Sequence, residues 1–545
     1  MSKQVRTLIL AGAAVIALVA LLLVLLFLLP GGGEDASSLV SSDTSVTVLD
    51  KSVDADGKTV DHPIKSIQIT IQDESYTLSQ NDDGDLVADS YRDLPVNTYE
   101  ISSLESALAT ITATREISSN PESPADYGFT GEFAQPVSSA DTSSDTSSGV
   151  SSAESSEGEP EVTVGLTAQI TVTYHDDSVH SFEIGRESPT GEGYYLRKVG
   201  SDPVYLVEST FADTVSQPST AYIGLNVVTS PSVRTDDDSG QVVLRDIELS
   251  GRVRTSPLVL RYATEADNLT FSDYVITKPY YRATNSSSDV IESFGTYTSV
   301  TASGVEKPYP TSEDLKQYGL DDPYSVAVFT LAVQTTKEAE NSGEEAGIEY
   351  YNIQKHTIQL GNQNDNGEYY ALVYNEDERI PVIYRFSEAS VSWAEAQYDD
   401  LAETMLFSNN IDSVSHIVVT VNGQETDFQL EHFPDETARD DQLKVTVGGE
   451  VYDTGNFRDL YQVFMSIYRQ GAAPGEISGD PVFSLRLVPL EESGNAVDLS
   501  IYKYDPNVYI VRCATGETYA VNATDVNHAI KQIENYLAGE EVRTN

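Results

Sequence analysis

The stretch IQLGNQNDNGEYYALVYNEDERIPVIY, residues 358–384, decides the fold of this chain. Its apolar residues occur in short runs separated by glycine, asparagine and aspartate, which is typical of antiparallel strands joined by tight turns. The same features occur in the same order at residues 182–206, FEIGRESPTGEGYYLRKVGSDPVYL. Both stretches contain a strand with a glycine, a Tyr-Tyr strand and a Pro-Val strand. This self-similarity indicates a repeated structural unit.

The repeat extends upstream to a turn that contains a Tyr-Gly pair. Tyr127-Gly128-Phe129 precedes a predicted strand at 168–175, and Tyr318-Gly319-Leu320 precedes one at 325–333. The first copy is longer, and its extra residues coincide with a serine-rich run at 134–160 that has no Lys, Arg or aromatic residue. Such a segment buries too little apolar surface to order itself, so we expect a disordered insertion within the first copy.

Each copy begins with a predicted hairpin and a helix. In the first copy, isoleucines alternate with polar residues at 67–71, a turn sequence follows at 81–85, and apolar residues take helical spacing at 101–111. A third, more divergent copy starts with the strand and turn at 417–423 and ends with an amphipathic helix at 526–537. This third copy has neither the Tyr-Gly turn nor the Tyr-Tyr strand.

A segment near the N-terminus predicts a membrane anchor. Residues 8–29 include no charged side chain, and a helix of this length spans roughly 33 Å, enough for a hydrocarbon core of about 30 Å. Lys3 and Arg6 precede the segment, so the positive-inside rule keeps the N-terminus cytoplasmic and exports the rest. A cleaved signal peptide is the alternative, but the run is longer than usual and ends at Leu29-Pro30 without a small-x-small site.

These patterns predict an α+β fold. An N-terminal transmembrane helix is followed by two to three tandem, mainly antiparallel β-rich modules with packed helices. The predicted boundaries are a cytoplasmic N-terminus at 1–7, the transmembrane helix at 8–29, a stalk linker at 30–61, module 1 at 62–225, module 2 at 226–410 and the divergent module 3 at 411–540.

Charge and cysteine content exclude several classes of protein. The chain has 32 Lys and Arg against 86 Asp and Glu, a formal net charge of −54 that repels nucleic acid, so we expect no nucleic-acid partner. The single cysteine, Cys513, rules out a disulfide within the chain and lies too far from the N-terminus for lipid attachment there. This composition suits the outer side of a bacterial cell membrane.

The repeated landmarks resemble a family of membrane-anchored bacterial proteins known as domain of unknown function forty-three forty. The motif residues that carry the resemblance are Tyr127, Gly128, Gly185, Tyr194, Tyr195, Tyr318, Gly319, Leu320, Pro323, Gly361, Tyr369 and Tyr370. The resemblance implies extracytoplasmic repeats behind an N-terminal helix and an accessory role in the cell envelope, beside systems similar to gliding-motility or ABC-type exporters. It implies no catalytic residues.

The motif residues themselves are interpreted as structural. Gly128 and Gly319 lie where a helix would end and a strand begin, which favours a residue of positive φ. Gly185 and Gly361 are expected to end strands at hairpins. Paired tyrosines place one ring on each face of a strand, one of them in the core.

Sites for metals are weakly indicated. His175 and His180 flank a predicted hairpin without further ligands nearby, and the Asn-rich turn before Gly367 lacks the glutamate that closes an EF-hand loop. The acidic runs at 82–85 and 236–238 are candidates for loose, millimolar Ca²⁺ binding, with solvated turns as the simpler interpretation. We therefore predict no catalytic, cofactor-binding or metal-ligating residues.

The absence of a catalytic motif favours a non-catalytic, membrane-anchored extracytoplasmic scaffold or accessory protein, whose partners are the membrane and another envelope or transporter protein. One alternative is a module that binds a cell-wall polymer or carbohydrate, because exposed tyrosine rings can stack on sugars. A second alternative is an exported hydrolase.

Overall fold

The computed structural model of the protein describes residues 45–53, 58–60, 62–133, 165–237, 239–264, 267, 269, 272–294, 297–337, 347–490 and 496–544. The predicted transmembrane segment at 8–29 and the predicted serine-rich insertion at 134–160 lie outside these residues. Within them, no helix combines the length and the apolar character needed to cross a bilayer.

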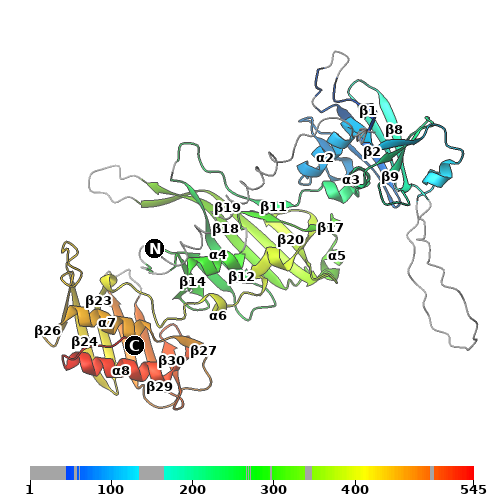
Figure 1. Cartoon of the computed structure of the whole chain (residues 1–545). Coiled ribbons are helices and arrows are strands. Elements are labelled where there is room, and N and C mark those ends of the chain that lie inside the picture. The colour runs from blue at the N-terminus through cyan, green and yellow to red at the C-terminus, as the bar shows by residue number, and fades with distance from the viewer. Residues whose placement is uncertain are drawn as a thin grey trace, which may run out of the picture. The chain divides into compact units, whose positions relative to one another are not determined.

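Three large antiparallel sheets dominate the structure (Figure 1). Each is built from strands of one predicted module, although the module boundaries themselves stay a prediction. The first sheet contains β2 (Ile64–Ile71), β3 (Glu74–Gln80), β4 (Leu86–Ala88), β6 (Arg115–Ser118), β7 (Ala168–Tyr174), β8 (Val179–Glu187), β9 (Tyr194–Lys198) and β10 (Val204–Val207).

The second sheet contains β12 (Gln241–Ser250), β13 (Leu258–Tyr262), β14 (Tyr274–Lys278), β15 (Arg282–Ala283), β17 (Gly304–Pro308), β18 (Ser325–Lys337), β19 (Gly347–Gln363), β20 (Tyr369–Asn375), β21 (Glu378–Arg379) and β22 (Val382–Phe386). The third contains β23 (Val414–Val421), β24 (Gln424–His432), β25 (Leu443–Val447), β26 (Glu450–Tyr452), β27 (Arg469–Ala472), β28 (Phe483–Pro489), β29 (Val497–Lys503), β30 (Val508–Cys513) and β31 (Thr518–Asn522).

All three sheets follow one topology. The spatial orders are β4-β3-β2-β7-β8-β9-β10-β6 in the first sheet, β15-β14-β13-β12-β18-β19-β20-β22-β17 in the second and β26-β25-β24-β23-β28-β29-β30-β31-β27 in the third. The chain runs from the centre to one edge, crosses over to place one strand at the opposite edge, and returns to the centre for four more strands. The third copy, which lacks the sequence motif, therefore has the same fold as the other two.

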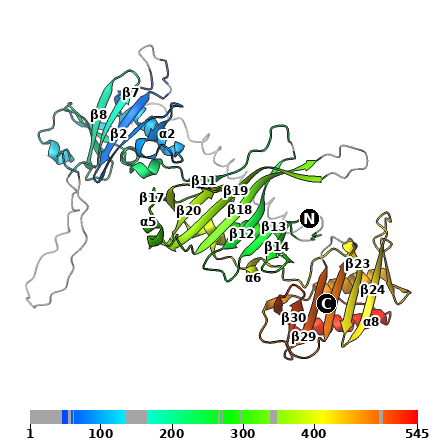
Figure 2. The same cartoon turned by 180° about the vertical axis from the view of Figure 1, so that it is seen from behind.

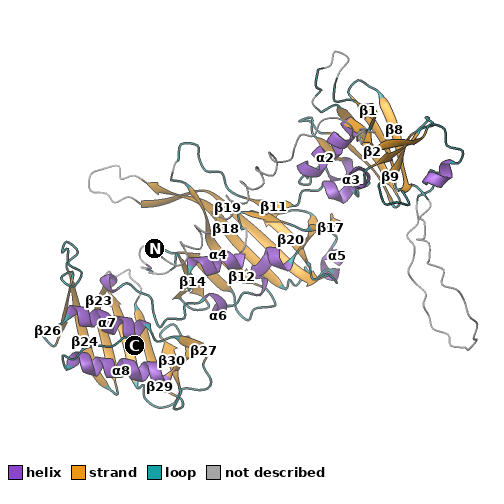
Figure 3. Ribbon diagram, viewed as in Figure 1, coloured by secondary structure: helices purple, strands orange, loops and turns teal. Residues whose placement is uncertain are grey.

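Helices cover one face of each sheet. Figure 3 shows this for α7 (Thr454–Met465) and α8 (Ala523–Leu537), which cover the third sheet. Figure 2 shows the strands of the third sheet from the other side. The described helices before these are α2 (Thr98–Ala109), α3 (Ser209–Val215), α4 (Ser287–Phe294), α5 (Ser312–Gln317) and α6 (Tyr398–Leu401), and the 3₁₀ helices are η1 (Asp89–Tyr91), η2 (Pro124–Tyr127), η3 (Ser219–Tyr222), η5 (Glu388–Glu395) and η6 (Ile411–Ser413).

Apolar spacing explains why these helices pack where they do. In α8, Val526, Ala529 and Ile533 are spaced three and four residues apart and are buried, because that spacing places them on one face. Asn522 caps the helix, with its side chain accepting a hydrogen bond from the backbone N–H of Thr524. In β23, Ile417 and Val419 are buried as alternation requires for a sheet with one covered face.

Part of the predicted stalk linker is a strand. Val46–Asp50 forms β1, which pairs with β5 (Thr110–Ala113) in a separate two-stranded sheet, so the linker prediction is wrong for these five residues. Val46 and Leu49, apolar residues within the predicted linker, are half-buried in this strand. A second small sheet pairs β11 (Asn226–Thr229) with β16 (Ser299–Thr301).

Candidate functional site

The Tyr-Gly turn of the second sheet follows α5. Thr311 caps this helix, and its side chain and that of Asp314 form a reciprocal capping box. The chain then reverses at Gly319, whose φ of +70° is the left-handed conformation that glycine adopts at low cost. Gly128, with a φ of +87°, has the same role after η2 in the first sheet. The prediction of positive φ at both glycines is confirmed.

Gly185 and Gly361 have a different role from the predicted one. Both lie inside strands, β8 and β19, so the prediction that they end strands at hairpins is wrong. A Cβ atom on Gly361 would lie 2.1 Å from the carbonyl oxygen of Tyr318, and one on Gly185 would lie 2.0 Å from that of Tyr127. Glycine is needed because the backbone of the turn presses directly on the strand.

The turns and strands of the motif form two small clusters, separate from the main cores, which we call the motif clusters. In the first sheet the cluster contains Ile117, Tyr127, Phe129, Phe133, Leu166, Tyr195 and Val204. In the second it contains Leu315, Tyr318, Leu320, Tyr370, Leu372, Tyr374 and Ile383. Matching residues of two copies thus make matching clusters.

Ring pairs occupy the same place in both motif clusters. The ring centroids of Tyr318 and Tyr370 are 4.5 Å apart, and those of Tyr127 and Tyr195 are 5.0 Å apart. Tyr369 instead lies in the main core of the second sheet, so the Tyr-Tyr strand has one ring on each face. These contacts give the motif a packing role.

The remaining motif residues lie beside these clusters. Tyr194 is half-buried at the start of β9, where it pairs with Val207. Pro323 lies between the Gly319 turn and β18, and its carbonyl oxygen accepts a hydrogen bond from the backbone N–H of Arg252 at 3.2 Å.

Two residues in the turns named as metal candidates, Asp237 and Asn364, accept hydrogen bonds from protein groups. Asp237 accepts hydrogen bonds from the hydroxyls of Thr335, Tyr351 and Ser239 at 2.9 Å each. Asn364 accepts backbone N–H bonds within its own turn, at 3.0 Å and 2.9 Å. Across the described residues, no three His, Cys, Asp or Glu side chains gather where they could hold a metal ion.

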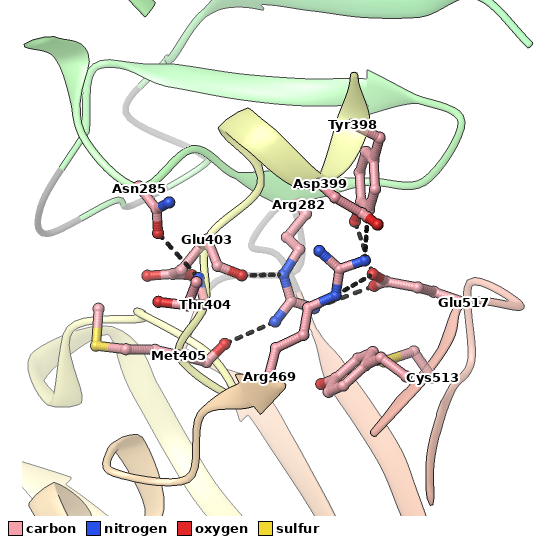
Figure 4. A network of polar contacts seen from close by, with 11 residues as sticks. Arg282, Asn285, Tyr398, Asp399, Glu403, Thr404, Met405, Arg469, Cys513 and Glu517 are labelled. Atoms are coloured by element: carbon pink, nitrogen blue, oxygen red, sulfur yellow. Dashed lines mark hydrogen bonds and ion pairs between the residues drawn. The ribbon is translucent and has the colours of Figure 1, made fainter. Parts of the chain in front are cut away.

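A buried network of charged side chains joins the second and third sheets, and no pattern in the sequence predicted it (Figure 4). Its centre is Arg282 of β15, whose side chain is 8% exposed. The guanidinium donates from Nε to the carbonyl oxygen of Glu403 at 2.8 Å, from Nη2 to that of Met405 at 2.6 Å, and from Nη1 to Oε2 of Glu517 at 3.1 Å. We call this set the junction.

Glu517 lies in the turn between β30 and β31 and is 3% exposed. Its other oxygen, Oε1, accepts a hydrogen bond from the hydroxyl of Tyr398 at 2.9 Å and lies 3.7 Å from Nε of Arg469. Arg469 of β27 also pairs with Asp399 in α6. Two guanidinium groups are therefore balanced by two carboxylates, Glu517 and Asp399, within the junction.

Glu403 is a third carboxyl at this place, and the charge of Arg282 nearby favours its ionised form. Arg282 bonds to its backbone oxygen instead of its side chain. The side chain bonds to Ser408, and its Oε1 has no hydrogen-bond partner among the described residues. Burial raises the pKa of Glu403 to about 7, because a carboxylate loses hydration in this place.

Glu403 is one of the residues that line a cavity of about 130 Å³. The cavity wall includes Leu406, Phe407, Val497, Leu499 and Cys513. Arg282 and Glu517 line it too, so one end is polar and the rest mainly apolar. The junction and this cavity form the candidate functional site.

The junction has five charged residues, and none of them belongs to a periodic pattern. They come from four distant segments of the chain: Arg282, Asp399 with Glu403, Arg469, and Glu517. The one weak signal was Arg282 itself, a scarce cation that directly follows two tyrosines. Arginine side chains are more commonly exposed than buried, so this signal alone does not predict a buried network.

Comparison with known protein families gives one match. A family model described as "Domain of unknown function (DUF4340)" matches residues 87–224 and 275–460, together more than half of the chain. No curated protein and no solved structure matches the chain.

Proposed function

Since this chain belongs to the DUF4340 family, whose function is unknown, we propose a function from its own residues: a non-catalytic scaffold or accessory protein, anchored in the bacterial cell membrane by one helix. Its β-rich modules lie outside the cell and contact another envelope protein. An ABC-type transporter is the proposed class of partner, as the family resemblance implies.

The anchor is supported by the sequence of residues 8–29. An uncharged segment of this length is stable in a bilayer and costly to expose to water. The net charge of −54 on the whole chain keeps the exported part soluble and away from anionic lipid.

The observation that carries the proposal is the junction. Burying the two arginines and the Glu517 carboxylate costs desolvation, and this cost is offset only while each group keeps its partners. Arg282 therefore favours one arrangement of β15 against the turn that carries Glu517. A scaffold needs such fixed connections between modules, because a partner must be held at a defined place.

The wall-polymer alternative has less support. Sugar-binding sites use exposed aromatic rings, whereas the tyrosines of the motif clusters pack against one another. The most exposed tyrosine among the described residues is Tyr99, at 75%, in the first turn of α2. The hydrolase alternative has no catalytic motif in the sequence to support it.

Crosslinking in living cells tests the proposal. The full chain, carrying an affinity tag, is crosslinked with formaldehyde and purified from the membrane fraction. We expect a reproducible envelope protein in the product. The control variant Ile16→Arg/Leu23→Arg, which disrupts the predicted span, should leave the membrane fraction and lose that partner. Recovery of the chain alone would contradict the proposal. Recovery of the same proteins with the unaltered chain and with the double variant would contradict it too.

A further inference from the structure

A second cavity, of about 170 Å³, lies beside α7, one of the helices that cover the third sheet. Four residues of α7 line it, and they share one face of the helix because they are three or four positions apart: Arg458, Tyr461, Gln462 and Met465. Arg439, from the loop between β24 and β25, lines it as well. Engineered protein cavities of about 150 Å³ bind benzene, so a small aromatic molecule fits this volume.

The lining of this cavity is positively charged, although the chain as a whole is strongly acidic. Among the described residues that line it, Arg439 and Arg458 are charged, and there is no Asp or Glu. The whole chain has 86 Asp and Glu against 32 Lys and Arg, so this lining departs from the composition. Such a place attracts anions that the rest of the surface repels.

Arg458 is a buried cation whose charge is only partly compensated. Its side chain is 10% exposed, and its one hydrogen bond among the described residues runs from Nη2 to the carbonyl oxygen of Arg439 at 3.0 Å. Nη1 lies 4.0 Å from Oδ1 of Asp412, which is too far for a hydrogen bond, and that carboxylate is 63% exposed and screened by water. A buried guanidinium with so few partners is costly, and a bound anion would offset that cost.

The nitrogen of Arg458 that can reach an anion is Nη1. Nε is shielded from solvent and has no partner, so it cannot serve a ligand. Nη1 also lacks a hydrogen bond within the described residues but is not shielded in this way. One N–H donor of a buried guanidinium is therefore accessible.

Further donors surround this nitrogen. Arg439 is exposed and forms no ion pair within the described part of the chain, so its guanidinium is available. Gln462 is exposed and lines the cavity with an amide. The side-chain oxygen of Asn410, another lining residue, accepts a hydrogen bond from the backbone N–H of Asp412 at 3.1 Å, which leaves its NH₂ group as a donor.

The charge and the lining favour a carboxylate over a phosphate. The two guanidinium groups and the nearby Asp412 carboxylate leave a single positive charge in excess, which matches a monovalent anion better than a phosphate dianion. Ile411 and Tyr461 are buried and line the same cavity, so part of the wall suits an apolar group.

We propose that this cavity binds a small organic carboxylate. Nη1 of Arg458 and the guanidinium of Arg439 donate to the carboxylate oxygens, and Ile411, Tyr461 and Met465 contact the apolar body. This inference goes beyond the proposed scaffold function and does not depend on it.

Fluorine NMR titration of the full chain in detergent tests the proposal. The ligand is 4-fluorobenzoate at neutral pH and physiological salt, and its uncharged match is 4-fluorobenzyl alcohol; detergent without protein gives the baseline. We expect the carboxylate to bind at least tenfold more tightly than the alcohol. Equal binding of both compounds, or binding of neither, would overturn the proposal.

Arginine variants assign the binding to this cavity. Arg439→Gln and Arg458→Gln should each weaken the binding of 4-fluorobenzoate about tenfold, the loss expected for one hydrogen bond to a charged group. The matched control is Arg486→Gln, at an exposed arginine of β28, which should stay within twofold of the parent. If Arg458→Gln fails to fold, Arg439→Gln decides alone. Unchanged affinity in Arg439→Gln, or an equal loss in Arg486→Gln, would refute the site.

Competition distinguishes the class of anion. Unlabelled benzoate should displace 4-fluorobenzoate from the parent chain, whereas inorganic phosphate at the same concentration and ionic strength should not. Displacement by phosphate as strong as that by benzoate would overturn the assignment to a carboxylate.

Discussion

The motif clusters and the junction both hold parts of this protein together, but by opposite kinds of contact. In the motif clusters, Gly185 and Gly361 let backbone meet backbone, and tyrosine rings pack beside them. In the junction, Arg282 and Glu517 bury charges that depend on each other. Removing one contact from a motif cluster should cost a small amount of stability. Removing one partner from the junction leaves an unpaired buried charge, which costs more.

The largest effect is expected in the junction, from Glu517→Gln. This change leaves the guanidinium groups of Arg282 and Arg469 with one balancing carboxylate, and should cost about 4 kcal/mol of stability. Hydrogen exchange of the amides in β30 and β31 measures it in the full chain. The matched control is Glu431→Gln, whose partner Lys444 is exposed, with an expected cost under about 1 kcal/mol. Similar costs for both variants would contradict the account.

The next effect is a pH dependence caused by Glu403. Its pKa is about 7 in the folded protein against an ordinary value of 4.5, so the folded state binds the proton more tightly than the unfolded state. Stability from this group is present below pH 4.5 and is lost as the pH rises to about 7. At pH 8, Glu403→Gln should therefore be more stable than the parent by about 3 kcal/mol, with little difference at pH 4.

Urea unfolding of both proteins at the two pH values measures this difference. Glu450→Gln, at an exposed site on β26, provides the control and should show no such change between the two pH values. A Glu403→Gln variant that is destabilised equally at both pH values would contradict the prediction, because the stability would then not depend on the charge of Glu403.

A smaller effect is expected in the motif clusters from Gly361→Ala. The new Cβ would lie 2.1 Å from the Tyr318 carbonyl oxygen, so the turn must move away, at a cost of about 2 kcal/mol. Gly185→Ala should cost the same, because its contact with Tyr127 is equivalent. Thermal unfolding compares both with Gly455→Ala in α7, where the nearest atoms to the new Cβ lie at 3.5 Å, an ordinary contact distance. A cost for Gly361→Ala no greater than for this control would exclude the close contact.

The smallest effect is expected from the ring pairs. Tyr318→Leu keeps apolar volume but removes the ring contact with Tyr370, and should cost about 1 kcal/mol. Tyr99→Leu, at a side chain that is 75% exposed, should change stability by less than about 0.5 kcal/mol. The same unfolding measurement compares the two, and a cost for Tyr318→Leu that matches Tyr99→Leu would show that the ring pair is not a packing contact.

The parts of the fold that could be predicted are those determined by the sequence of a single strand, helix or turn. Alternation at 67–71 and helical spacing at 526–537 correspond to β2 and α8, because burial of one face leaves a periodic trace. Gly319 was assigned its positive φ from the turn alone. The close contact at Gly361 was not predictable, because the atom that excludes a side chain there comes from another segment.

The sequence predicted a repeated unit with a divergent third copy, but the strand order of the sheets and the junction were not predictable, for the same reason. The third copy lost the motif but kept its strand order, since strand order depends on buried alternation along each strand and not on one signature. Arg282 and Glu517 are 235 positions apart and become partners only when β15 meets the β30–β31 turn. A lone charge in a strand carries no information about such a partner.

The central claim, that the junction holds the second and third sheets in one arrangement, is tested most directly by a spin-label distance measurement. Labels at Glu248 in β12 and Arg486 in β28, both exposed, are placed in a full chain with Cys513→Ser. The account predicts one narrow distance distribution that broadens when Glu517→Gln is added. A distribution that is already broad in the parent, or one that Glu517→Gln leaves unchanged, would contradict it.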